Sequence, residues 1–212
     1  MPHGSYDPVR LAYHGWKKWL VGPIERFFLR RATKVLVTCA AEAEWVRAYE
    51  PRVKTVEILD VKKYFGVRVG VGEGVGEGVG EGEGEGEGEG GGVHVLYLGR
   101  RHPLKGVEYL EQAVKEIGDG VELRIVSNAH GEEKEKVWAW CDVLCLPTLS
   151  DNFGLVVAEA LERNKRVITT DGAPAWEDWH DRRLVYLKGY RNGDAATRVE
   201  LLKRALRGWG RV

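Results

Sequence analysis

Short apolar runs alternate with segments of helical periodicity over the second half of the chain. The runs are rich in Val, Leu and Ile, which is typical of buried strands, and the segments between them repeat apolar residues every three or four positions, which is typical of amphipathic helices. In chain order, the expected elements are strand Val93–Leu98, helix Val107–Ile117, strand Val121–Val126, helix Glu132–Ala139, strand Val143–Pro147, helix Gly154–Arg163, strand Arg166–Thr170, a weaker strand Arg183–Leu187 and helix Val199–Trp209. This alternation predicts an α/β fold built on a doubly wound parallel sheet.

Residues 1–66 show a shorter pattern of the same kind. They predict a helix within Trp16–Leu29, a strand at Val35–Thr38, a helix at Glu42–Tyr49 and a second strand at Thr55–Leu59. Pro23 is expected to interrupt the first helix. The helix mixes aromatic residues with Lys and Arg, which allows two interpretations. It either lies on an anionic membrane surface or packs its aromatic side chains into the core of this region.

Residues 67–92 differ from both neighbouring regions. They repeat Gly-Val-Gly-Glu and then Gly-Glu, and they hold about half of the chain's 28 Gly residues. Gly has no side chain to bury and loses the most backbone entropy on ordering, so we expect a flexible acidic linker. The predicted organisation is therefore a first domain at 1–66, a linker at 67–92 and a second domain at 93–212.

Composition narrows the functional classes. Of 212 residues, 43% are hydrophobic, and 32 basic residues balance 32 acidic ones, so no net charge attracts the chain to nucleic acid. No apolar run reaches the roughly 20 residues of a membrane span, and the N-terminus lacks a signal-peptide pattern. The three cysteines have no metal-ligand spacing, and Cys141 and Cys145 lie in an apolar run. Such thiols are typical of a reducing cytoplasm, where we expect the protein, either free or peripheral at the inner face of the membrane.

The loop after the third strand of the second region carries the strongest chemical pattern. Ligands bind at the carboxyl ends of strands in such sheets, so the expected binding loops are 99–106, 127–131, 147–154 and 171–176. The amides of Asn152 to Leu155 begin a helix, where unpaired N–H groups favour an anion, and Gly154 lets a phosphate approach closely. Asp151 and Glu159 differ by roughly 80° around the helix axis, so both can face one cleft and accept hydrogen bonds from sugar hydroxyls. The alternative is that Asp151 caps the helix and Glu159 is a solvated residue.

Loop 99–106 adds a basic pair. Arg100 follows a strand directly, and Lys105 stands five positions later beside a Gly. The two can converge on one diphosphate, Arg as a bidentate donor and Lys as a point charge. Basic surface residues without a ligand are the alternative for this loop.

Together, these motifs resemble a known family. The order Gly-Arg…Lys-Gly, then Leu-Pro-Thr-Leu-Ser-Asp-Asn-Phe-Gly-Leu-Val-Val-Ala-Glu-Ala-Leu, then Val-Ile-Thr-Thr-Asp-Gly-Ala-Pro is similar to the C-terminal, Rossmann-type domain of retaining family 4 GT-B glycosyltransferases (glycosyl transferases group 1). The resemblance covers roughly residues 93–180. It implies that Arg100 and Lys105 neutralise a nucleotide diphosphate and that Glu159 holds the ribose. It also implies that Asp151 addresses the donor sugar and that the amides of Phe153, Gly154 and Leu155 complete the phosphate site. Such enzymes need no metal and no cofactor besides the nucleotide sugar.

The first region resembles the second half of the family's acceptor-side domain, and departures accompany that resemblance. The first half of that domain, with the strand that usually presents a catalytic His, has no counterpart in the sequence. His3 and His14 are candidates to face the cleft, and solvated turn positions are the alternative. Asp151 stands where the family has Glu, and the interval Ser127–Gly131 is too short for the helix and strand that normally follow the second strand.

These patterns support one leading hypothesis and two alternatives. The leading hypothesis is a glycosyltransferase that moves a hexose or related sugar from a nucleoside diphosphate to a glycan or lipid-linked acceptor with retention. The first alternative is a donor-binding subunit that needs a partner chain to complete the acceptor domain. The second is a non-catalytic remnant in which the Gly- and Glu-rich segment replaces lost structure.

Overall fold

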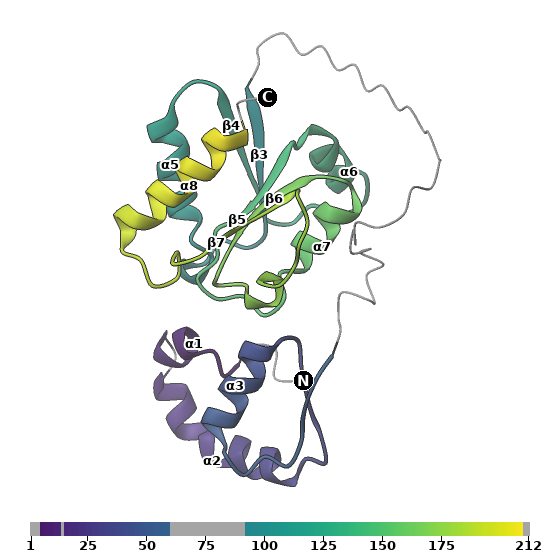
Figure 1. The fold of residues 1–212 in the computed structure, drawn as a ribbon, viewed down its shortest axis with the longest axis vertical. Coiled ribbons are helices and arrows are strands. Elements are labelled where there is room, and N and C mark those ends of the chain that lie inside the picture. The colour runs from purple at the N-terminus through teal and green to yellow at the C-terminus, as the bar shows by residue number, and fades with distance from the viewer. Residues whose placement is uncertain (1–4, 14, 60–91, 210–212) are drawn as a thin grey trace.

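The computed structural model describes residues 5–13, 15–59 and 92–209, which form two parts (Figure 1). His3, His14 and all of the predicted linker except Gly92 lie outside the described residues.

The C-terminal part is built on a five-stranded sheet in which every pairing is parallel, in the order β4-β3-β5-β6-β7. The strands are β3 (Val93–Leu98), β4 (Val121–Val126), β5 (Val143–Leu146), β6 (Arg166–Thr170) and β7 (Leu184–Leu187). Leu96, Leu144 and Ile168 are fully buried at its centre. Because both faces of a parallel sheet are covered, its strands read as continuous apolar runs, and this pattern made the fold predictable. The predicted doubly wound α/β fold is confirmed.

Helices cover both faces of this sheet (Figure 1). Helices α5 (Val107–Ile117) and α8 (Ala195–Trp209) pack together on one side, and α6 (Gly131–Trp140) and α7 (Leu155–Glu162) lie on the other. Helix α8 begins at Ala195, earlier than predicted, because the Asp194 carboxylate accepts a hydrogen bond of 2.8 Å from the Thr197 amide and caps the helix. Two 3-10 turns, η1 (Pro103–Lys105) and η2 (Pro174–Trp176), complete the loops at the carboxyl ends of β3 and β6.

The cysteines behave as core residues. All three are free, and Cys141 and Cys145 are buried among the strands and helices of the C-terminal part. Burial raises the pKa of Cys141 to about 12 and raises that of Cys145 as well. These thiols therefore stay protonated at neutral pH.

The first part is smaller and contains the elements predicted for it, preceded by one further helix. These are α1 (Pro8–Tyr13), α2 (Gly15–Arg31), β1 (Val35–Val37), α3 (Ala40–Tyr49) and β2 (Val56–Ile58). Strands β1 and β2 form a two-stranded parallel sheet, and Leu29, Val37 and Val46 form part of a separate core.

Helix α2 corrects one expectation and excludes one of the two interpretations of its aromatic residues. It continues through Pro23 without interruption, because Pro removes only its own backbone donor and this turn of the helix is exposed. The aromatic side chains that the structure describes on this helix do not pack into the core, since Trp19 is 80% exposed, Phe27 50% and Phe28 65%. Among the described residues, no helix is long and apolar enough to cross a membrane.

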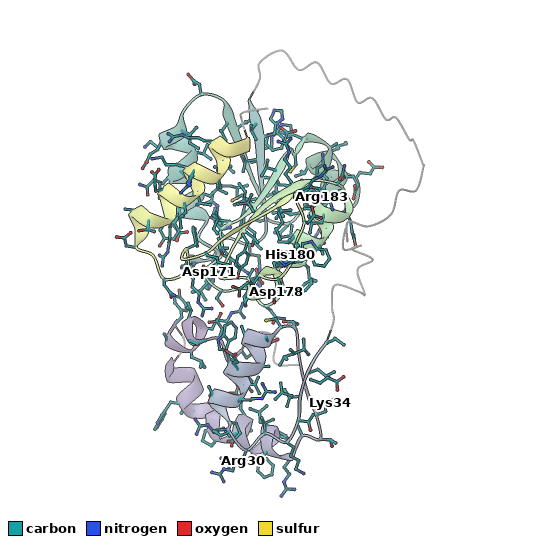
Figure 2. All side chains as sticks on the ribbon, in the orientation of Figure 1. Arg30, Lys34, Asp171, Asp178, His180 and Arg183 are labelled. Carbon is teal, nitrogen blue, oxygen red and sulfur yellow. The ribbon has the colours of Figure 1, made fainter. Side chains whose placement is uncertain are left out.

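A buried polar cluster joins the two parts. Asp7, at the start of α1, is fully buried, pairs with Arg191 and accepts a hydrogen bond from the Ser150 hydroxyl. Asp171 lies on the side of the C-terminal part that faces the first part (Figure 2). Its carboxylate accepts the amides of Gly189 (2.8 Å) and Arg191 (2.7 Å), which orients the segment that carries Arg191.

Candidate functional site

A cavity of about 620 Å³ opens at the carboxyl ends of β3 and β5. Its walls come from the loops after these strands, from the start of α7, and from Thr38 of the first part. The Thr38 amide and hydroxyl both donate to the buried Glu42 carboxylate (2.7 and 2.9 Å), which fixes Thr38 at the start of α3. The cavity therefore lies between the two parts, as expected from the topology of the sheet.

The structure brings most of the predicted site residues together in this cavity. Its lining includes Arg100, Lys105, Asp151, Asn152, Phe153, Gly154 and Leu155. Glu159 is not among the lining residues. Of the expected binding loops, 127–131 contributes Ser127 to the lining. Loop 171–176 does not line the cavity but is hydrogen-bonded to the loop before α7.

The start of α7 is shaped to present backbone amides. Gly154 adopts a left-handed conformation (φ 67°, ψ 59°), which is strained for any residue with a side chain. The chain thereby turns sharply from the loop into α7. The amides of Leu155 and Val156, in the first turn, have no acceptor within the helix. Amides in this position favour a bound anion.

Asp151 is held in place by three contacts. Its carboxylate pairs with the Lys105 ammonium, and it also accepts the amide of Asn152 at 2.8 Å. Its own amide donates to the Gly172 carbonyl at 2.7 Å. A side chain at Gly172 would overlap the Thr148 carbonyl, so only Gly permits this approach of the two loops. The pair of Lys105 and Asp151 places opposite charges side by side in the cavity wall.

Trp176 supports the same loop from the core, a role that sequence reasoning missed. Its indole N–H donates to the Phe153 carbonyl, and the two rings lie 5.0 Å apart. Trp176 is fully buried and also contacts Trp179. The only available signal was that Trp176 stands in a predicted binding loop.

Tyr97 positions the other cationic residue. Its hydroxyl donates to the Arg100 carbonyl at 2.9 Å, and this bond fixes the backbone from which the Arg100 side chain extends. Burial and the nearby Asp151 carboxylate raise the pKa of Tyr97 to about 12. Tyr97 is therefore a neutral donor at physiological pH.

Glu159 has a partner that the sequence did not predict. The Lys134 ammonium of α6 lies 2.6 Å from the Glu159 carboxylate, and both side chains are partly exposed. The two acids that were expected to share a cleft are thus each paired with a different lysine. Among the described residues, no group of His, Cys, Asp and Glu is arranged to hold a metal ion.

Comparisons with known proteins define the class of fold. Neither a family model nor a curated protein matches the chain. A sucrose-phosphate synthase from Thermosynechococcus elongatus is similar in structure, with a TM-score of 0.58 and 18% identity over 89% of this chain and 53% of the other. The catalytic domain of starch synthase IV from Arabidopsis thaliana, bound to ADP and acarbose, gives a TM-score of 0.45 and 14% identity over 59% of this chain and 33% of the other.

At this identity, the likeness to the sucrose-phosphate synthase shows the fold alone. That fold is the GT-B fold of glycosyltransferases, with a Rossmann-type parallel sheet. The chain spans about half the length of this synthase.

Proposed function

We propose that this chain is a retaining glycosyltransferase that uses a nucleoside-diphosphate sugar as donor. The cavity between the parts carries the proposal, because it combines Arg100, Lys105 and the amides at the start of α7 in one wall. Its volume, about 620 Å³, lies in the range of roughly 300–1,000 Å³ that is usual for ligand sites.

The diphosphate would lie against these groups. Arg100 can donate two parallel hydrogen bonds to a phosphate, and the Leu155 amide and its neighbours point their dipoles at the same place. When the bond to the sugar breaks, negative charge develops on the diphosphate, and fixed cations and amides stabilise it without reorganising. This arrangement needs no metal ion, so chelators should leave activity unchanged.

Asp151 and Glu159 would bind the hydroxylated ends of the donor. Asp151 lies in the cavity wall, and we assign it to the donor sugar. Glu159 would hold the ribose hydroxyls, and its ion pair with Lys134 orients its carboxylate. Lys105 would bridge the two functions, since it pairs with Asp151 and belongs to the diphosphate wall.

The acceptor would enter from the side of the first part and is a glycan or a lipid-linked glycan. Helix α2 supports a peripheral location at an anionic membrane. Leu20, Ile24, Phe27 and Phe28 follow the spacing of a single helix face and are all exposed, and Arg26 and Arg31 lie on the same helix. Helix α2 lies on the side of the first part that is away from the C-terminal part (Figure 1). Sedimentation with anionic vesicles should therefore be lost when Phe27 and Phe28 are replaced by Ser, whereas neutral vesicles should not sediment the protein.

Isothermal titration of the full chain with UDP, GDP and ADP tests the donor site. We expect saturable binding of at least one nucleotide, weakened in both Arg100→Ala and Glu159→Ala. Arg207→Ala, an exposed change at the end of α8, serves as the matched control and should bind as the wild type does. No binding of any nucleotide, or equal binding by all variants, would refute the site.

Incubation with UDP-, GDP- and ADP-sugars and a panel of acceptors tests transfer, and the anomeric configuration of the product tests retention. Nucleotide binding without turnover would instead favour a donor-binding subunit. The two-stranded sheet of β1 and β2 would then be the surface on which a partner chain adds strands, and co-purification would identify it.

A further inference from the structure

A second, smaller pocket of about 330 Å³ adjoins the donor cavity. Its lining consists of Arg10, Arg100, Arg101, His102, Leu104, Lys105 and Ser150. Arg100 and Lys105 line both spaces and form the wall between them. Arg10 comes from α1 of the first part, so the second pocket, like the donor cavity, is lined by residues of both parts.

The charge of this pocket is one-sided. Four of its lining side chains are cationic and none is acidic. Two of the four are engaged elsewhere, since Lys105 pairs with Asp151 and Arg101 donates two hydrogen bonds (3.1 and 2.6 Å) to Glu111. Like charges gathered in one concave space repel each other, and an anion bound among them removes that repulsion.

The guanidinium of Arg10 is oriented so that it can bind such an anion. Its Nε donates to the Ser150 hydroxyl at 3.0 Å, and the Ser150 hydroxyl in turn donates to Asp7. This chain of bonds fixes the guanidinium plane through one nitrogen only. The two terminal nitrogens of Arg10 make no hydrogen bond to any of the described residues and can form a bidentate pair with an oxyanion.

His102 adds a further donor. Its Nδ1 accepts the Leu104 amide at 3.1 Å, so the ring donates through Nε2. The ring also makes an edge contact with Tyr13 of α1, with centroids 5.5 Å apart. The pocket therefore offers a fixed Arg fork, a further Arg and an imidazole N–H, a set suited to a phosphate with several acceptor oxygens.

We propose that the acceptor carries a phosphate group and that Arg10 and His102, together with Arg100, bind it in this pocket. The inference rests on the proposed function, because it takes the adjoining cavity as the donor site. A phosphomonoester on a sugar and the phosphate of a lipid-linked glycan share this chemistry. Either would bring the acceptor hydroxyl next to the donor sugar, because the two pockets share a wall.

The test separates this pocket from the donor site. Wild-type protein, with the donor cavity first saturated by the nucleotide that binds best, is titrated with hexose phosphates, with a short-chain lipid phosphate and with the neutral hexoses. If no nucleotide binds, the same titrations are run without one. Arg10→Gln removes the fork, and His102→Asn keeps an acceptor for the Leu104 amide while removing the Nε2 donor. Arg10→Lys retains the charge without the fork, and Arg207→Gln is the surface control.

We expect phosphorylated ligands to bind and neutral hexoses to bind at least about tenfold more weakly, which corresponds to one charge-assisted hydrogen bond. Arg10→Gln and His102→Asn should each weaken phosphate binding much more than nucleotide binding, since neither residue lines the donor cavity. Glu111→Gln should strengthen phosphate binding by releasing Arg101.

The preference between hexose phosphate and lipid phosphate identifies which kind of acceptor carries the phosphate. Equal binding of neutral hexoses, or unchanged phosphate binding in Arg10→Gln, would overturn the inference even where nucleotides bind. If the wild-type chain binds no nucleotide but binds phosphate, and Arg10→Gln weakens that phosphate binding, the donor site is wrong and the anion pocket is retained.

Discussion

Two buried tryptophans of the same core offer a controlled measurement of what holds the loop before α7 in place. Trp176 is fully buried and donates its indole N–H to the Phe153 carbonyl, just before α7. Trp138 is 2% exposed, and its indole nitrogen has no hydrogen-bond acceptor among the described residues. Trp176→Phe and Trp138→Phe remove the same atoms from two buried side chains, although the Arg163 guanidinium lies 5.5 Å from the Trp138 ring centroid. Only the first change also removes a hydrogen bond.

The expected difference follows from the cost of a buried hydrogen bond. Losing the bond to the Phe153 carbonyl in a site closed to water should cost about 1–3 kcal/mol beyond the lost packing. Trp138→Phe loses packing but also removes a buried donor without a partner, which offsets part of its cost. Trp176→Phe should therefore be the less stable variant by about 2 kcal/mol, or about 4–8 °C in Tm for a chain of this size.

Urea unfolding followed by far-ultraviolet circular dichroism measures both variants without relying on tryptophan fluorescence. Equal losses of stability would refute the reasoning, because packing alone would then account for both. Nucleotide titration supplies a second readout. Trp176→Phe should weaken nucleotide binding because it loosens the loop before α7, whereas Trp138→Phe should not.

Further predictions concern the contact between the parts, the approach of two loops and the buried thiols. Asp7→Asn should lower the free energy of unfolding by about 3–5 kcal/mol in urea titrations, because it leaves the partner charge of Arg191 uncompensated in a buried site. Gly172→Ala should destabilise by about 1–3 kcal/mol through overlap with a neighbouring carbonyl, and nucleotide titration should show weaker binding. Cys141 and Cys145, whose thiol pKa values are raised by burial, should resist a thiol-specific reagent at pH 8 in the native protein, and all three cysteines should react in denaturant.

The fold of the C-terminal part was largely predictable because short stretches of sequence identify each of its strands and helices. Each strand is an apolar run bounded by turn residues, and each helix repeats its apolar positions at helical spacing. Parallel topology then required the loops after β3 and β5 to meet at one edge. The prediction that Arg100, Lys105 and the start of α7 lie together followed from this, and the cavity contains all of them.

Contacts between segments that are distant in the sequence could not be predicted from such patterns. The pairing of Lys134 with Glu159 joins two helices, and that of Asp7 with Arg191 joins the two parts. No periodicity marks either pair, since each residue alone resembles an ordinary charged position. The sequence left the aromatic face of α2 undecided for a related reason. Whether a face is buried depends on what packs against it, and Phe28 is exposed.

The loop that precedes α7 contacts several different regions of the molecule. Ser150 is bound to Asp7 of the first part, Asp151 to Lys105 and Gly172, and Phe153 to Trp176 of the core. Neighbouring residues of one short segment thus contact the first part, the cavity and the sheet. A shift of the first part relative to the C-terminal part would therefore be felt at Ser150, next to Asp151. Under the proposed function, this segment is where the binding of an acceptor and the binding of a donor would influence each other.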